Sequence, residues 1–183
     1  MKLSIIVPAY NEAERIGPML DAYLPYFAAR YGDTFEMIVA VNGSRDDTAA
    51  VAQARTAHYP QLHVLVEPRP IGKGGAIMFG GAHARGEWIG FVDADGATPP
   101  EAFDDLLKNI GDAGLIIASR RLPGAVVQPR QPWQRRAASR VFNFLVRKLF
   151  KLSITDTQCG AKLMSAEAWQ AIVPKIGLTK WAF

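Results

Sequence analysis

Short apolar runs alternate with longer mixed segments along most of the chain. Five runs rich in β-branched and aromatic residues are bounded by Pro, Gly or Asn, so we expect buried strands at Leu3–Val7, Phe35–Val41, Leu62–Val66, Trp88–Val92 and Leu115–Ala118. The segments between them predict helices over Glu12–Tyr31 with Asn11 as N-cap, from Asp46 to about Ala57, from Gly72 to about Ala84 and from Pro99 to about Ile110. This alternation predicts an α/β fold with a mostly parallel sheet and helices on both faces.

The pattern changes after Arg121. The segment Leu122–Pro132 predicts a loop, Trp133–Leu152 mixes apolar with basic residues and predicts a helix, and Thr155–Gly160 predicts a polar loop. A length of 183 residues favours a single domain over residues 1–183. No apolar run approaches the roughly 18 residues that span a bilayer. The single cysteine, Cys159, excludes an internal disulfide and suits a reducing compartment.

The net charge of +4 conceals an uneven distribution. Residues 1–112 hold nine Lys and Arg against fifteen Asp and Glu, whereas residues 113–183 hold twelve against two. No acidic residue lies between Ala113 and Thr155. A basic block of this kind indicates an anionic partner: a phosphate, an anionic lipid surface or a nucleic acid. We expect no nucleic-acid partner, because that function would leave the acidic motif described next unexplained.

Two carboxylates, Asp93 and Asp95, follow the fourth predicted strand. Residues i and i+2 of a strand share a face, and open α/β sheets bind ligands at the carboxyl ends of their strands. Paired carboxylates there suit Mg²⁺ or Mn²⁺ carrying a diphosphate. A solvated strand end is the alternative for so short a motif.

A glycine-rich segment, Gly72–Gly75, precedes this acidic motif. Its bare backbone and Lys73 suit a phosphate, although a lysine at a helix start can equally be solvated. The segment is not a Walker loop, because a glycine rather than Ser or Thr follows the lysine. At the end of the first strand, Pro8, Tyr10 and Glu12 can present a ring and a carboxylate to a base and a ribose. A plain strand-to-helix turn is the alternative.

Taken together, these motifs resemble the family 2 glycosyltransferases with the GT-A fold. The segment Asn42–Thr48 resembles the family's Asp-Asp-Gly-Ser-x-Asp-x-Thr turn, Asp93-Ala94-Asp95 its metal-binding Asp-x-Asp, and Ala118-Ser119-Arg120 its Gly-Ser-Arg. Residues Asp156–Leu163 are similar to the Asp-Thr-Gln-Cys-Gly-Phe-Lys-Leu segment of the polyprenyl-phosphate subgroup. The Gly-Lys-Gly-Gly-Ala, Asp-Ala-Asp-Gly-Ala-Thr and final Trp-Ala-Phe segments look most like dolichyl-phosphate β-glucosyltransferases.

The resemblance implies a Rossmann-like GT-A domain that moves a hexose, with inversion, from a nucleotide-sugar donor, UDP-glucose above all, to a polyprenyl or dolichyl phosphate. Residues 1–112 would bind the donor and residues 113–183 the acceptor. Asp95 is the expected first metal ligand for Mg²⁺ or Mn²⁺, and Asp93 would share the metal or hold the ribose. The expected nucleotide-binding residues are Pro8, Tyr10, Glu12, Asn42, Lys73 and Asp93.

A phosphate acceptor is largely ionised at neutral pH, so it needs cations that hold it in line more than it needs a general base. The resemblance implies that Arg120 and either Arg135 or Arg136 bind the acceptor phosphate, with Gln158 beside them. For Asp156 and Gln158, hydrogen bonds that fix their own loop are an equal alternative. The expected catalytic residues are Asp95, Arg120, Arg136 and Asp156.

Two departures from the family pattern affect these expectations. Val41 and Asn42 stand where relatives carry two aspartates; Asn42 can still hydrogen-bond a uracil edge, whereas Val41 cannot. The family continues past its Trp-Ala-Phe into an acidic segment, and relatives carry membrane helices, so we expect a C-terminally truncated domain.

The basic and aromatic helix Trp133–Leu152 suits the membrane interface, although a core-packed helix with a solvated basic face is the alternative. We therefore expect a cytoplasmic protein, peripheral on the cytoplasmic face of a membrane, of unknown oligomeric state.

Other functions fit the same motifs. A GDP-mannose-dependent polyprenyl-phosphate mannosyltransferase, a transferase with a non-lipid acceptor and a non-catalytic nucleotide-sugar-binding module all stay open. A nucleotidyltransferase is disfavoured, because such enzymes usually carry an N-terminal glycine-rich loop and Pro8–Glu12 has none.

Overall fold

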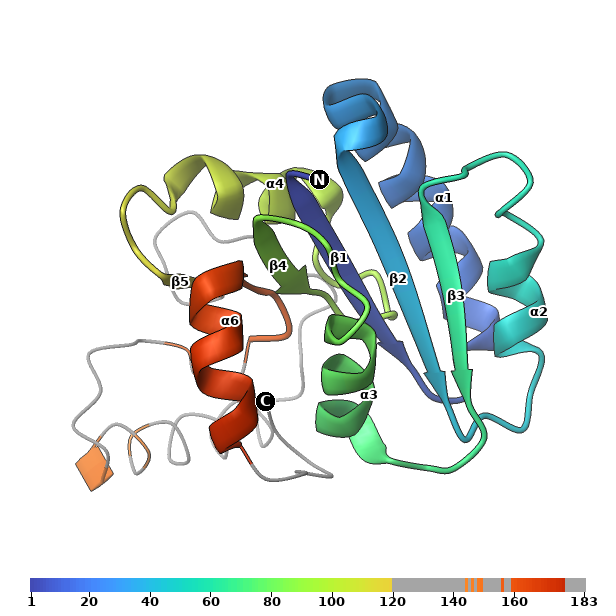
Figure 1. Ribbon diagram of the computed structural model, residues 1–183. Coiled ribbons are helices and arrows are strands. Elements are labelled where there is room, and N and C mark those ends of the chain that lie inside the picture. The colour runs from blue at the N-terminus through green and yellow to red at the C-terminus, as the bar shows by residue number, and fades with distance from the viewer. Residues whose placement is uncertain (120–143, 145, 147, 150–155, 157–158, 177–183) are drawn as a thin grey trace.

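The computed structural model describes residues 1–119, 144, 146, 148–149, 156 and 159–176 (Figure 1). The predicted loop Leu122–Pro132 lies outside the described residues. Of the predicted helix Trp133–Leu152, the structure describes residues 144, 146, 148 and 149, and all four are helical.

A six-stranded sheet forms the centre of the described fold. Its strands are β1 (Leu3–Ala9), β2 (Phe35–Asn42), β3 (Leu62–Glu67), β4 (Trp88–Phe91), β5 (Leu115–Ile117) and β6 (Lys162–Ser165), in the spatial order β3-β2-β1-β4-β6-β5. β1 pairs in parallel with β2 and β4, and β2 pairs in parallel with β3. β6 runs antiparallel between β4 and β5. The five predicted strands and the mostly parallel sheet are therefore confirmed, whereas the sequence did not predict β6.

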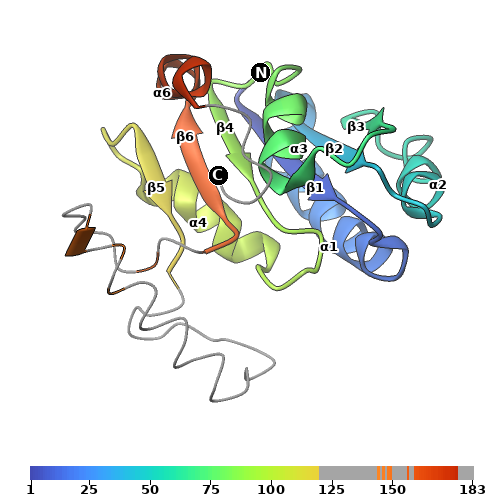
Figure 2. The ribbon, with the colours of Figure 1, turned by 90° about the horizontal axis from the view of Figure 1, so that it is seen from below.

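Helices cover both faces of the sheet (Figure 2). On one face, α1 (Ala13–Tyr31) packs on β2, α2 (Thr48–Gln53) on β2 and β3, and α4 (Pro100–Asn109) on β6 and beside α1. On the other, α3 (Gly72–Gly81) packs on β1 and β2, and α6 (Ala166–Ile172) packs on β4 and β6. Short 3₁₀ turns follow α1 at Gly32–Thr34 and α6 at Val173–Lys175. Because both faces are covered, every residue of β1 and β2 is buried, which explains their almost continuous apolar sequences.

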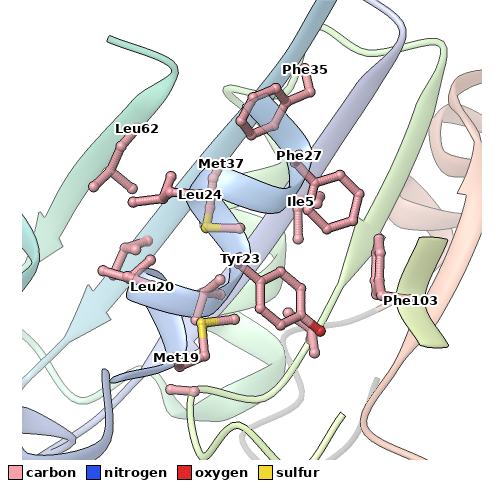
Figure 3. Close-up of a cluster of buried hydrophobic side chains, with 14 of the residues drawn as sticks. Ile5, Met19, Leu20, Tyr23, Leu24, Phe27, Phe35, Met37, Leu62 and Phe103 are labelled. Carbon is pink, nitrogen blue, oxygen red and sulfur yellow. The ribbon is translucent and has the colours of Figure 1, made fainter. Parts of the chain in front are cut away.

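The larger core cluster lies between α1 and the sheet (Figure 3). Tyr23 and Phe27 stack with ring centroids 5.7 Å apart, and Phe103 of α4 meets both rings edge-on. Removing one such buried aromatic side chain costs about 3–5 kcal/mol. This core fixes α1 and α4 on the sheet, and therefore the loops that precede them.

The start of α1 differs from its prediction. Asn11 is not the N-cap: it has a left-handed φ of 52°, and its Oδ1 accepts the backbone N–H of Arg45 at 2.9 Å. Glu12 is the N-cap, without a side-chain capping bond, and Asp46 Oδ2 accepts the N–H of Ala13 instead. The prediction of Asn11 is wrong because this helix start is capped from another loop.

The last predicted turn of α2 also differs, since the helix ends at Gln53 rather than near Ala57. The backbone continues in turns closed by i to i−3 hydrogen bonds, from Arg55 to Ala52 and from Thr56 to Gln53. In the part of the chain that the structure describes, no helix has both the length and the apolar composition to cross a bilayer.

Candidate active site

A cavity of about 440 Å³ opens where β1, β2 and β4 end and α3 begins. Its lining residues are Pro8, Tyr10, Glu12, Arg15, Asn42, Pro70, Gly72, Lys73, Asp93, Ala94 and Asp95. All six expected nucleotide-binding residues and the expected metal ligand Asp95 are among them. The cavity lies at the carboxyl ends of the parallel strands, as expected for a ligand site in an open α/β sheet.

Hydrogen bonds between two loops hold the β1 end of the cavity. Ser44 Oγ accepts the N–H of Asn11 at 3.0 Å, and Thr48 Oγ1 accepts the N–H of Glu12 at 2.8 Å. The turn after β2 therefore fixes the turn after β1. Just before these anchors, Tyr10 is 52% exposed, which leaves an aromatic surface at the rim for a planar ligand.

The two departures from the family pattern lie in different environments. Val41 is buried in the larger core cluster and does not line the cavity. Asn42 lines the cavity with a side chain that is only 2% exposed, and its Nδ2 donates to the carbonyl of Ala9 at 3.1 Å. This bond fixes the orientation of the amide at the wall of the cavity and uses one of its two donor hydrogens.

Three carboxylates of the cavity influence one another. Burial raises the pKa of Glu12 above its ordinary value of 4.5, the ion pair with Arg15 opposes this shift, and the charges of Asp95 and Asp93 add to it. Asp95 is exposed, and its Oδ1 accepts the N–H of Ala97 at 3.0 Å. A cation in the cavity would relieve the repulsion among these groups.

Lys73 supplies part of that positive charge. It stands at the second position of α3, after Gly72, whose φ of 76° lets the chain turn into the helix. Its Nζ forms an ion pair with Oδ1 of Asp93, and both side chains are partly exposed, at 42% and 36%. The ammonium therefore lies in the cavity beside the first carboxylate of the acidic motif.

The acidic pair fits a divalent metal as part of a larger ligand set. The described residues contain no group of three or more His, Cys, Asp and Glu side chains that could hold a metal ion. An ion bound here would use Asp93 and Asp95 and complete its shell with diphosphate oxygens and water, as Mg²⁺ does in many phosphate sites.

The predicted acceptor side is only partly described. Arg120, Arg135, Arg136 and Gln158 lie outside the described residues. Asp156 is buried at 2% exposure and does not line the cavity.

Lys162 is a candidate functional residue that the sequence reasoning did not single out. It begins β6, pairs with Phe91 in the β4–β6 register, and its Nζ lies 5.6 Å from the centre of the Phe91 ring. Burial lowers the pKa of Lys162, the neighbouring Lys73 lowers it further, and the charges of Asp156 and Asp93 oppose the shift. Its only signal in the sequence was its place at the end of the Asp-Thr-Gln-Cys-Gly-x-Lys segment.

The sequence profile of glycosyl transferase family 2 matches residues 4–173. The chain belongs to this family. A dolichyl-phosphate beta-glucosyltransferase of Trichomonas vaginalis is 37% identical over 98% of this chain and 56% of its own length. The human dolichyl-phosphate beta-glucosyltransferase is 34% identical over the whole chain and 60% of its own length. The chain thus spans a little over half the length of these relatives.

Solved structures share the fold. The mannosyltransferase PcManGT from Pyrobaculum calidifontis, solved with GDP-Man and Mn²⁺, superposes with a TM-score of 0.66 over 93% of this chain and 46% of its own, at 21% identity. Glucosyl-3-phosphoglycerate synthase from Mycobacterium tuberculosis, solved with UDP, gives 0.63 over 99% of this chain and 68% of its own, at 20% identity. The GT-A fold expected from the sequence is confirmed.

In this family 2 domain, the structure brings the donor-side predictions together, whereas Asp156 is not among the residues that line the cavity. Seven predicted residues from four separate stretches of the chain line one cavity. Their individual roles stay predictions, because the cavity shows proximity rather than contact with a substrate.

Proposed function

We propose that this chain is the catalytic GT-A domain of an inverting, metal-dependent glycosyltransferase that moves glucose from UDP-glucose to a dolichyl or polyprenyl phosphate. The observation that carries the proposal is that an exposed tyrosine, an oriented amide, a lysine and two carboxylates all line one cavity. The dolichyl-phosphate beta-glucosyltransferases, similar over nearly the whole chain, support the choice of sugar and acceptor.

In this proposal, residues 1–112 hold the donor. Tyr10 covers the base, Asn42 hydrogen-bonds its edge, and Lys73 binds the diphosphate. Asp95 holds a divalent ion, Mg²⁺ or Mn²⁺, and Asp93 shares it or holds the ribose. When bound, the ion neutralises negative charge on the leaving nucleoside diphosphate.

Residues 113–183 take the acceptor phosphate in the same proposal. Arg120 and one of Arg135 and Arg136 hold the phosphate in line with the anomeric carbon, and Asp156 and Gln158 shape the surrounding loop. An ionised phosphate is its own nucleophile, so orientation and charge balance are the main tasks of these residues.

We also propose that the protein lies on the cytoplasmic face of a membrane. Phe144 and Leu149 are 62% and 75% exposed on a helical segment that also carries the exposed Lys148. Exposed apolar side chains beside cations suit an anionic lipid surface. The acid-free stretch from Ala113 to Thr155 surrounds them in sequence.

A calorimetric screen with UDP, GDP, UDP-glucose and GDP-mannose, each with and without Mn²⁺, tests the donor. We expect UDP and UDP-glucose to bind more tightly with the metal than without it, and more tightly than the guanine nucleotides. Tighter GDP-mannose binding would move the assignment to a mannosyltransferase. Binding without transfer of labelled glucose to a short polyprenyl phosphate would indicate a nucleotide-sugar-binding module.

A further inference from the structure

The carboxylate of Asp93 packs directly against the backbone of Gly160. A β-carbon added at Gly160 would overlap Oδ2 of Asp93 and would lie 2.6 Å from its Cγ and 3.2 Å from its Oδ1. Side-chain carbons do not approach other atoms this closely in packed proteins. The position of the Asp93 carboxylate therefore depends on residue 160 having no side chain.

Space, rather than backbone conformation, explains this glycine. The described glycines with positive φ are Gly32, Gly43, Gly72, Gly96 and Gly111, and Gly160 is not among them. An alanine could adopt its backbone angles without strain. A glycine is needed at this position only because the Asp93 carboxylate occupies the space that a side chain would fill.

The same carboxylate is held from its other side. Lys73 Nζ pairs with Oδ1, while Oδ2 and Cγ face Gly160. The charge of Lys162, two residues after Gly160, also acts on this group. Asp93 therefore lies between the start of α3 and the segment that leads into β6.

We propose that Gly160 is a positioning residue: its bare backbone seats the Asp93 carboxylate in the orientation that the metal and the nucleotide need. Gly160, next to the expected acceptor-side residues in the sequence, thereby shapes the donor site. This inference rests on the proposed function for the role of Asp93, and it adds a residue that acts only through that side chain.

The structure predicts an unusual result for Gly160→Ala. The atoms in the way are the far end of a flexible side chain, so the fold can accept the methyl group by rotating the carboxylate away. At Gly86 and Gly90, by contrast, a β-carbon would lie 2.6 Å from the Ser4 backbone nitrogen and 2.7 Å from the Lys162 carbonyl oxygen, and neither backbone atom can rotate away. Gly160→Ala should therefore spare the fold and impair the site.

Calorimetry with Mn²⁺ and UDP measures this effect. We expect Gly160→Ala to weaken Mn²⁺-dependent UDP binding about 10- to 100-fold, the usual loss when a partner that orients a metal ligand is changed. Gly114→Ala is the matched control, since its β-carbon would lie 3.7 Å from Ala168 Cβ, an ordinary contact, and Gly114 does not line the cavity. It should bind as the unmodified chain does.

The carboxyl ¹³C resonances of Asp93 and Asp95, measured without any ligand, separate positioning from general damage. In Gly160→Ala the Asp93 resonance should move and the Asp95 resonance should not. An Asp93→Ala background removes the three atoms that would lie nearest to the added methyl group. There, Gly160→Ala should leave the melting temperature and the residual metal-free UDP affinity unchanged.

The outcomes distinguish a failure of the positioning role from a failure of the proposed function. Unchanged Mn²⁺-dependent UDP binding, an unmoved Asp93 resonance, or a loss that persists in the Asp93→Ala background would overturn the positioning role. If the unmodified chain binds no nucleoside diphosphate, the proposed function fails. The Asp93 resonance still decides in that case whether Gly160 seats the carboxylate.

Discussion

Replacing Lys73 with methionine should separate the stability of this domain from its chemistry. Methionine keeps the length of the side chain and a similar helix propensity, and it removes only the charge. The ion pair with Asp93 is partly exposed on both sides, and such pairs contribute only about 0–1 kcal/mol. We therefore expect Lys73→Met to change the free energy of unfolding by less than about 1 kcal/mol.

The effect on nucleotide binding should be larger. A hydrogen bond between an ammonium and a diphosphate is charge-assisted, and hydrogen bonds to charged groups contribute about 1.5–3 kcal/mol. Since about 1.4 kcal/mol corresponds to a tenfold change in affinity, Lys73→Met should weaken Mn²⁺–UDP about 10- to 150-fold.

The effect of Lys73→Met on the affinity for Mn²⁺ without nucleotide should have the opposite sign. In the free protein, Lys73 neutralises Asp93, so a metal that uses Asp93 must displace the ammonium or share the carboxylate with it. Removing the ammonium should tighten Mn²⁺ binding without nucleotide by up to about fivefold, the equivalent of about 1 kcal/mol. The coupling between metal and nucleotide then falls, because the lysine no longer moves from the carboxylate to the diphosphate.

Calorimetry of Mn²⁺ alone, UDP alone and the two together tests all three expectations. Lys175→Met is the control, because Lys175 is exposed and does not line the cavity. If Lys73→Met weakens the binding of Mn²⁺ alone, or leaves Mn²⁺–UDP affinity unchanged, Lys73 does not exchange between the carboxylate and the diphosphate.

Two further predictions concern the acidic motif and acid stability. Asp95→Ala should remove the Mn²⁺ dependence of UDP binding in the same calorimetric assay, and an unchanged metal response would exclude Asp95 as a ligand. Burial raises the pKa of Glu36, but hydrogen bonds from Ser4 Oγ and from the backbone and side chain of Arg85 outweigh it and hold the pKa below 4.5. This carboxylate therefore stabilises the fold above pH 4.5 and loses that contribution as the pH falls through its lowered pKa. Glu36→Gln should cost about 1–3 kcal/mol at pH 7 and flatten the loss of stability in acid, and parallel acid-unfolding curves for the two proteins would contradict this.

The parallel half of the fold could be predicted because its signals are local. β1 and β2 are buried on both faces, so their sequences are almost continuously apolar, and the apolar runs are followed by Pro8 and Asn42. The start of α3 at Gly72 follows from a glycine that turns the chain into a helix. Ligands bind at the carboxyl ends of parallel strands. Once these strands are assigned, this rule therefore predicts that Tyr10, Asn42 and Asp93 lie at one site.

What could not be predicted depends on contacts between distant segments. β6 has only four residues, Lys162–Ser165, and its pattern alone does not distinguish a strand from a loop. It becomes a strand by inserting antiparallel between β4 and β5, against the order of the sequence. Gly160 and Lys162 acquire their places beside Asp93 only through that insertion. The prediction of Asn11 as the N-cap was wrong for a related reason, since Asp46, in another loop, accepts the N–H of Ala13 at the start of α1.

The charges that line the cavity explain why the proposed metal requirement belongs to the donor. Three carboxylates, on Glu12, Asp93 and Asp95, face two cations, on Arg15 and Lys73. The cavity is therefore net negative before a nucleoside diphosphate adds its own negative charge. A divalent ion reverses that balance, so donor binding should require the metal. The proposed acceptor phosphate instead approaches a segment without acidic residues between Ala113 and Thr155, so its binding should persist without the metal and weaken with salt.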